Sequence, residues 1–367
     1  MQVLTDPSAL TRLTPSWDQL RTDVPGPTTH LDWVLAHAEV IPPEERLCGV
    51  AVFDEGRVVA LAPLVESCSW PHRLRWLDTG DISSVFYLDE RHLADLARAI
   101  YRLRRPLTID AFVPGSLTDT ALREQRPRGW IRVVRPWVGV PALAIDDTWD
   151  DPVAKLGKKR RSEQRRTLRK AQSRGEVTFE VLTPSPGEAF EELFEEFVRL
   201  ESAGWKAAAG TALAQDRQQR EGLRRYLMAA AASGSFRITR MCIDHAPVAI
   251  HLNVVGASRL WGLKGAVDDT FKAVSPGLHL FAFTIGVAAE EGLEGFEFMG
   301  ATAPFKEMWG AVPVELHRYQ LYPPTPAGGM ALATDLARKG VKEASRRYRK
   351  GRARASTKAP TGEPVGA

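Results

Sequence analysis

The chain has 367 residues, of which 44% are hydrophobic and 26% charged, a mixture typical of globular rather than disordered proteins. A chain of this length is too long for a single hydrophobic core of ordinary size, so the sequence predicts two domains. The formal net charge of +4 gives no obvious overall attraction to nucleic acid, so the local distribution of charge matters more.

The cysteines and histidines argue against a disulfide framework and against a zinc enzyme. The three cysteines, Cys48, Cys68 and Cys242, are not closely spaced, and the eight histidines form no HExxH motif. Residues 1–16 lack the apolar run of a signal peptide, and no stretch approaches the roughly 18 apolar residues that a membrane span needs. We therefore expect no metal, no transmembrane segment and a cytoplasmic location.

The first half, residues 1–150, has the pattern of an α/β lobe. Two β-rich runs, at 50–53 and 58–65, flank Asp54-Glu55-Gly56-Arg57, which is a hairpin signal. The patterns that follow are a strand, a helix and a strand, at 74–77, 91–104 and 107–113.

A basic segment at 155–174 separates the two halves, and its composition favours a helix. Its cations are Lys155, Lys158, Lys159, Arg160, Arg161, Arg165, Arg166, Arg169, Lys170 and Arg174. Further helical patterns lie at 190–200 and 217–232. A charge run is usually a solvated helix face, so contact of this segment with RNA is the less favoured interpretation.

The second half, residues 151–325, repeats the order of the first. Its β-rich runs at 236–243 and 248–255 flank Asp244-His245-Ala246-Pro247. The patterns that follow are again a strand, a helix and a strand, at 260–263, 278–292 and 295–299. This order predicts an α/β fold of the α+β type with two similar lobes, each a mixed, mostly antiparallel sheet flanked by helices.

The C-terminal segment, residues 326–367, is predicted to be a basic, partly disordered tail. Pro323, Pro324 and Pro326 are expected to end the fold, and basic residues then run from Arg338 to Lys358. By contrast, the segment between the lobes is charged and holds no Gly/Ser linker, so the two lobes are expected to form one body.

A helix start in the second half is a candidate anion site. Ser275 suits an N-cap, and Pro276 suits the first helical position. Gly277 lets a large group approach the backbone. The amides of such a helix start bind anions, as the pyrophosphate of a nucleotide cofactor requires. Taken alone the pattern is weak, because an ordinary capped helix shares it.

Motifs around this helix start resemble a known family. They are Gly265 to Phe271, Ser275-Pro276-Gly277, Phe296-Glu297-Phe298 and Phe305 to Trp309, preceded by Glu201, Trp205-Lys206 and Gly210-Thr211. The set resembles the BioF2-like, CelD-type acetyltransferases of the GNAT superfamily, which are related to FemAB-type aminoacyltransferases. The resemblance covers about 150–322 and implies two GNAT-like lobes. Only Gly277 of the superfamily's acyl-CoA loop is present, so the donor stays open.

The resemblance implies an N-acyltransferase that moves an acyl group, expected to be acetyl, from acyl-CoA to an amine by direct attack. Positioning would supply most of the catalysis, and a backbone N–H near Lys264 to Ala266 would stabilise the oxyanion. The residues implied for the cofactor are Lys264, Gly265, Ala266, Ser275, Pro276, Gly277, Leu278 and His279.

The implied catalytic residues are Glu201, Asp268 and Lys306. Glu201, Asp268 and Glu297 compete for the role of proton acceptor, while Lys306 would hold an anion or steer the acceptor. A solvated or turn position remains the alternative for each carboxylate. The residues implied for the substrate are Trp205, Lys206, Thr211, Phe271, Glu297 and Trp309.

Two other functions stay open at this point. One is a FemAB-like aminoacyltransferase using aminoacyl-tRNA, and the other is a non-catalytic basic protein that binds RNA or a membrane. The helix start and the strand before it favour an enzyme, whereas the basic segments favour the alternatives. The expected acceptor is a small-molecule amine or an amine on a cell-envelope or polysaccharide precursor.

Overall fold

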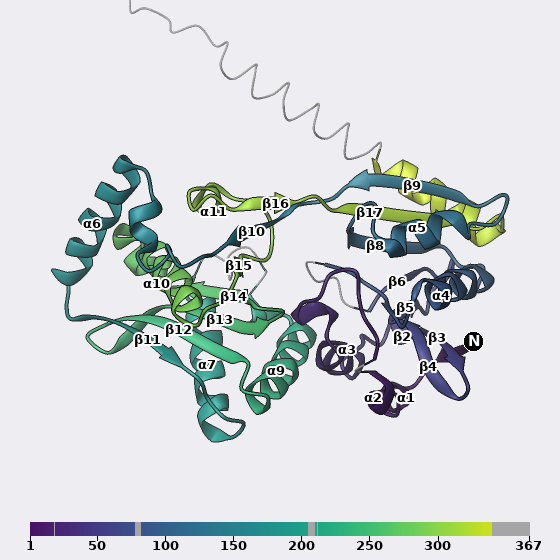
Figure 1. Cartoon of the computed structure of the whole chain (residues 1–367), viewed down its shortest axis with the longest axis horizontal. Helices are drawn as coiled ribbons and strands as arrows, with labels where there is room; N and C mark the ends of the chain where they lie inside the picture. The colour runs from purple at the N-terminus through teal and green to yellow at the C-terminus, as the bar shows by residue number, and fades with distance from the viewer. Residues whose placement is uncertain (18, 78–81, 205–209, 211, 340–367) are drawn as a thin grey trace, which may run out of the picture.

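The computed structural model describes residues 1–17, 19–77, 82–204, 210 and 212–339. The chain folds into two α/β lobes side by side, with the first half on the right of Figure 1 and most of the second half on the left. Each lobe carries helices against mixed, mostly antiparallel sheets. The predicted fold class is therefore confirmed.

The first half contributes its strands to two sheets. One has the order β1-β3-β4-β7 and the other β2-β5-β6-β8-β17-β9. The strands are β1 Gln2–Leu4, β2 Glu45–Leu47, β3 Gly49–Asp54, β4 Arg57–Ala62, β5 Leu64–Ser67, β6 Leu74–Trp76, β7 Phe86–Tyr87, β8 Leu107–Phe112 and β9 Ile131–Pro136. The helices are α1 Pro7–Thr11, α2 Thr14–Trp17, η1 Pro27–Thr29, α3 Leu31–Ala38, α4 Glu90–Arg102 and α5 Leu117–Glu124.

The predicted hairpin of the first half is present, with one change. Glu55 and Gly56 join β3 to β4, and both have positive φ (47° and 79°), as tight hairpin turns require. The run predicted at 58–65 divides at Pro63 into β4 and β5, which lie in different sheets. Proline lacks the N–H that a continuous strand would donate, so the chain changes sheet there.

The second half forms a seven-stranded sheet of order β11-β12-β13-β14-β15-β10-β16. Its strands are β10 Val140–Ala144, β11 Val177–Leu182, β12 Phe236–Ile243, β13 Ala246–Gly256, β14 Arg259–Val267, β15 Gly295–Glu297 and β16 Val312–Val314, and β17 is His317–Tyr322. The helices are η2 Pro152–Lys155, α6 Lys158–Gln172, α7 Glu188–Ser202, η3 Leu213–Gln215, α9 Arg217–Ala232, η4 Asp269–Val274, α10 Pro276–Glu290 and α11 Pro304–Glu307. The helices predicted at 190–200 and 217–232 correspond to α7 and α9.

The two lobes share a topology and exchange one strand each. In the first lobe β6 runs parallel to β8, and in the second β14 runs parallel to β15. The strand beside β8 is β17, from the end of the second half, while the strand beside β15 is β10, from the end of the first. Each of these strands therefore lies in the sheet of the other half, and Figure 1 shows the chain crossing between the lobes before β10 and before β17. A division into domains at residue 150 stays a prediction.

Residues 326–339 are helical, which corrects the prediction that the fold ends at the prolines. Gly328 N–H donates to Thr325 Oγ1 (3.2 Å), so Thr325 caps this helix and Pro326 follows at its first position. The helix docks through Asp335, whose Oδ2 accepts hydrogen bonds from Arg73 (2.7 Å), Gln320 (2.8 Å) and Tyr322 (2.6 Å). The tail predicted beyond residue 339 lies outside the described residues.

Candidate active site

A cavity of about 870 Å³ lies where the two lobes meet. Its walls come from β13, β14, the start of α10, α9 and the loop that follows β15, and the first half adds η1 and α3. The described residues that line it and bear on its chemistry are Thr28, Trp33, His37, Gln219, His251, Leu263, Lys264, Gly265, Asp269, Lys272, Ser275, Gly277, Met299 and Lys306.

The cavity lies beyond the point where the pairing of two parallel strands ends. β14 pairs with β15 only from Arg259 to Trp261, whereas β14 itself continues to Val267. Within that extension the register with β13 shifts between Leu252 and Asn253, which leaves Leu263 as a bulge residue opposite no residue of β13. A bulge re-aims the backbone locally and is common beside active sites.

The start of α10 faces the cavity, and its conformation differs from the predicted cap. Ser275 is left-handed (φ 54°, ψ 49°), and its side chain makes no capping hydrogen bond. Its carbonyl accepts from the amides of Leu278 (3.1 Å) and His279 (3.4 Å). Pro276 has no N–H, and the amides of Leu278 and His279 already donate to Ser275. From Pro276 to His279, Gly277 is therefore the residue whose amide remains available to an anion. The first turn holds no acidic residue.

Gly277 also packs closely against the neighbouring strand. A Cβ at this position would lie 3.1 Å from Cγ2 of Val267, so a side chain here would press on β14 and enter the cavity. Without a side chain, the backbone of this helix start is left open to the cavity.

Seven residues predicted for the site do line the cavity. They are Lys264, Gly265, Ser275, Pro276, Gly277, Leu278 and Lys306. The Lys264 ammonium donates to Gln219 Oε1 of α9 (3.1 Å). The Lys306 ammonium donates to the carbonyls of Met299 and Ala301 (2.8 Å for the second), so it holds the loop after β15 in place.

His279 does not contact the cavity, and its predicted role as a phosphate ligand is wrong. It is buried on the side of α10 that faces α6, where its Nε2 lies 3.0 Å from Thr167 Oγ1. Burial lowers the pKa of His279 to about 4, against an opposing hydrogen bond to the backbone of Val274. The imidazole is therefore neutral near pH 7 and cannot balance a phosphate charge.

The three candidate carboxylates are all held outside the cavity lining. Glu201 is buried and accepts from the Leu213 amide (2.8 Å), while Asp268 accepts from the amide and hydroxyl of Thr270 as a turn residue. Glu297 is buried against Arg259 (2.5 Å). Burial raises the pKa of Glu297 above its ordinary value, although Arg259 opposes the shift.

The remaining predicted residues separate into two groups. Ala266, Phe271 and Trp309 pack in hydrophobic clusters outside the cavity lining, with Arg174 over the Phe271 ring at 5.5 Å. The predicted substrate residues Trp205, Lys206 and Thr211 lie outside the described residues.

Sequence reasoning missed the contribution of the first lobe. Trp33 and His37 of α3 line the cavity because α3 packs against α9, and no motif in the second half signals that contact. It also missed a buried polar row that reaches the cavity at His251. His251 Nδ1 lies 3.3 Å from Thr284 Oγ1, and Thr284 contacts Thr239 (2.8 Å) and donates to the Leu280 carbonyl (2.7 Å).

Comparisons with known proteins agree with this architecture. Residues 158–307 match the sequence model of the family described as acetyltransferase (GNAT) domain. No curated protein matches the sequence significantly. Among the described residues, no helix is long and apolar enough to cross a membrane.

Solved structures share the fold at low sequence identity. A conserved protein of unknown function from Bacteroides thetaiotaomicron is 12% identical (TM-score 0.54, covering 87% of this chain and 99% of that one). The C-terminal domain of a protein assigned as a lysylphosphatidylglycerol synthetase, from Agrobacterium fabrum, is 12% identical (TM-score 0.53, 90% and 95%). FemX is 15% identical (TM-score 0.51, 79% and 90%).

The family match over residues 158–307 identifies an acyltransferase. Over residues 158–307 the chain is an acetyltransferase domain of the GNAT superfamily, and its two-lobed fold is shared with FemX. The match over residues 158–307 confirms the resemblance to the GNAT superfamily, and FemX shares the fold.

Proposed function

We propose that this protein is an N-acyltransferase that moves an acyl group, with acetyl the first candidate, from acyl-CoA to an amine by direct attack. The observation that carries the proposal is the start of α10. It has no side-chain cap and no acidic residue in its first turn, and it opens on the cavity between the lobes.

The pyrophosphate of the donor is assigned to this helix start. The Gly277 amide and the positive end of the helix dipole would face the anion. Ser275 and Lys272 line the same cavity. An amide, a hydroxyl and an ammonium together are donors that suit a diphosphate.

The acyl group is assigned to the part of β14 that extends beyond its pairing with β15. The bulge at Leu263 and the neighbouring Lys264 and Gly265 line the cavity there. A backbone N–H at the bulge would stabilise the oxyanion that forms when the amine attacks the thioester carbonyl. Lys306 would position the facing loop through its bonds to Met299 and Ala301.

The acceptor proposed first is an amine on a cell-envelope or polysaccharide precursor. The name of the lysylphosphatidylglycerol synthetase among the fold relatives motivates this choice. The cytoplasmic location predicted from the sequence stays a prediction.

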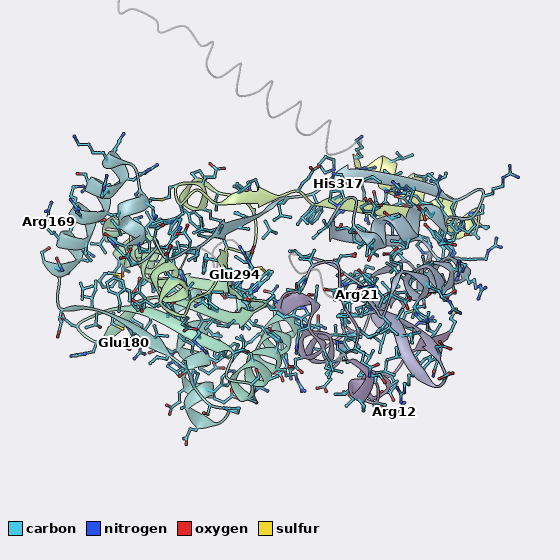
Figure 2. The ribbon with its side chains drawn as sticks, viewed as in Figure 1. Arg12, Arg21, Arg169, Glu180, Glu294 and His317 are labelled. Atoms are coloured by element: carbon cyan, nitrogen blue, oxygen red, sulfur yellow. The ribbon has the colours of Figure 1, made fainter. Side chains whose placement is uncertain are left out.

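The second candidate donor is aminoacyl-tRNA, and the surface of α6 favours it. Gln164, Thr167 and Ala171 bury one face of α6 against the rest of the lobe, while its cations are mostly exposed. Figure 2 shows Arg169 on this helix at the edge of the molecule. A phosphate backbone lying along α6 would meet a row of cations.

Calorimetry with acetyl-CoA tests the first proposal. Wild-type protein is expected to bind, and Gly277→Val is expected to weaken binding by about tenfold or more, which is ~1.4 kcal/mol. Because a Cβ at residue 277 also presses on Val267, the same change is made in a Val267→Ala background, where the strand contact is relieved. Unchanged affinity in both backgrounds would rule out this placement of the donor.

A charge-removal variant tests the second candidate. Lys158, Lys159, Arg160 and Arg161 are changed to Ser, and retardation of tRNA is measured at two salt concentrations. If the donor is acyl-CoA, wild-type protein retains little tRNA near physiological salt. Tight, salt-sensitive tRNA binding that the variant loses would replace acyl-CoA by aminoacyl-tRNA as the donor.

A further inference from the structure

Helix α3 brings a histidine from the first lobe to the cavity of the second. Trp33 and His37 of α3 line the same cavity as the start of α10 and the bulge of β14. The contact of α3 with α9 places them there, and Trp33 packs edge-on against Tyr226 of α9 (4.9 Å between ring centres).

The protonation pattern of the neutral His37 ring follows from its contacts. Nδ1 lies 2.9 Å from the carbonyl oxygen of Trp33. A carbonyl only accepts, so Nδ1 carries the hydrogen, and in the neutral imidazole Nε2 keeps its lone pair. This is the nitrogen that can take a proton.

The position of the His37 ring is also restricted. The ring stacks on Trp33, with 4.3 Å between centres and 28° between planes. The ring edge that carries Cδ2 and Nε2 packs against Gly222 of α9. A Cβ on Gly222 would lie 3.0 Å from Cδ2 and 3.1 Å from Nε2 of His37. Any larger residue at 222 would therefore press on this edge of the ring, so the position of the ring depends on the glycine.

Several charged groups on α3 and α9, the helices that pack together at His37, form ion pairs. Arg225 of α9 pairs with Glu39 and with Glu221, and Asp32 of α3 lies 3.4 Å from His30. The Lys264 ammonium, also in the cavity lining, donates to Gln219 of α9. Within the described residues no carboxylate contacts the His37 ring.

We propose that His37 is the proton acceptor for the attacking amine. The amine nitrogen forms a bond to the thioester carbonyl carbon, and its proton passes to Nε2 of His37. The C–S bond breaks, its electron pair leaves with sulfur, and the thiolate takes a proton from solvent while His37 returns its own to solvent. The step thus consumes an acyl thioester and an amine and yields an amide and a thiol. This inference rests on the proposed acyltransferase function.

The test compares His37→Asn with wild type. Asn keeps a donor for the Trp33 carbonyl but removes Nε2, and His37→Gln serves as a second variant that keeps a polar group at the ε position. Thiol release from acetyl-CoA is followed with glucosamine, lysine and spermidine as acceptor probes. His317→Asn is the matched control, because His317 lies on β17, outside the described cavity lining (Figure 2).

For His37→Asn we expect kcat/KM to fall by about 100-fold, in the range typical of a lost general base, with acetyl-CoA affinity unchanged. The decline of wild-type kcat/KM at acidic pH should disappear in both variants, because neither carries the nitrogen that takes the proton. A purely structural His37 would instead give a loss that is the same at every pH, which would overturn the proposal.

Nitrogen NMR of histidine-labelled protein supplies a readout that needs no acceptor, with His37→Asn used for assignment. The expected neutral form carries its hydrogen on Nδ1, and a ring protonated on Nε2 instead would overturn the assignment. A wild type that neither binds acetyl-CoA nor releases thiol removes the proposed function and this inference with it. A wild type that does both, with the acidic decline intact in the variants, removes only the role of His37.

Discussion

The starts of two equivalent helices show how the lobes differ. α4 and α10 each lie in the chain between two parallel strands of their lobe. At α4, Asp89 accepts from the His92 amide (3.0 Å) and Glu90 adds a second acid in the first turn. At α10, no side chain caps the helix and the first turn holds no acid. The same topology therefore gives one closed helix start and one open to an anion.

The difference extends to how each lobe uses its buried polar groups. In the first lobe, Asp335 ties residues 326–339 to Arg73, Gln320 and Tyr322. In the second, the polar groups at the ends of β14 and α10 line a cavity instead. We infer that the first lobe keeps the fold together and supplies a wall, while the second holds the donor.

The largest effect is expected at Asp335. Asp335→Ala leaves the Arg73 guanidinium without this buried carboxylate and should lower the free energy of unfolding by about 3–5 kcal/mol. Asp335→Asn, which keeps an acceptor, should cost less. Denaturant unfolding measures both, and acetyl-CoA affinity under native conditions should not change. A weakened affinity at equal foldedness would contradict the division of roles between the lobes.

The next effect concerns His279 on α10. Its folded pKa lies below that of the unfolded chain, so the unfolded state binds more protons and stability falls as pH drops from about 6.5 toward 4. Between pH 7 and pH 5 this contribution amounts to about 2 kcal/mol. Unfolding of wild type and His279→Gln over that range measures it. Equal pH dependence of the two proteins would show that His279 is not buried in its neutral form.

A smaller change should convert the start of α10 into one like that of α4. Ser275→Asp puts a carboxylate where the donor's phosphates are proposed, and aspartate tolerates the left-handed conformation. Acetyl-CoA affinity is expected to fall by about tenfold, or ~1.4 kcal/mol. Ser275→Asn has the same shape without the charge and should retain most of the affinity. An equal loss in both variants would point to shape rather than charge.

The smallest effect is the reverse experiment on α4. Asp89→Ala removes a cap and should cost about 1 kcal/mol of stability at neutral pH. The hydrogen bond from the His92 backbone lowers the pKa of Asp89, so this contribution is present at neutral pH and is lost as pH falls through the folded value. Thermal unfolding of wild type and variant at neutral and acidic pH checks this, and a difference that grows on acidification would contradict it.

Much of the fold could be predicted because local signals agree with the tertiary structure. Helix α9 has the predicted bounds, and the turn at Asp244 and His245 joins β12 to β13 as expected. The exchange of β10 and β17 could not be predicted, because a short apolar run such as Val140–Ala144 does not specify which sheet it joins. The helix that begins at Pro326 was not predicted, because proline is common both after the end of an element and at the first position of a helix.

The candidate site was likewise only partly predictable from the sequence. The helix start at Ser275, Pro276 and Gly277 could be predicted because consecutive residues determine it. The direction of the His279 side chain could not be predicted, because a shift of one position around α10 decides whether a side chain faces the cavity or α6. Trp33 and His37 come from the other lobe, and only the packing of α3 on α9 brings them in.

The central claim is that the donor is held at the start of α10, and the Gly277 amide reports on it directly. In glycine-labelled protein, the amide signal of Gly277, assigned with Gly277→Val, is followed while acetyl-CoA is added. The account predicts a saturable shift with the dissociation constant that calorimetry gives. A Gly277 signal that stays in place while calorimetry records binding would contradict it.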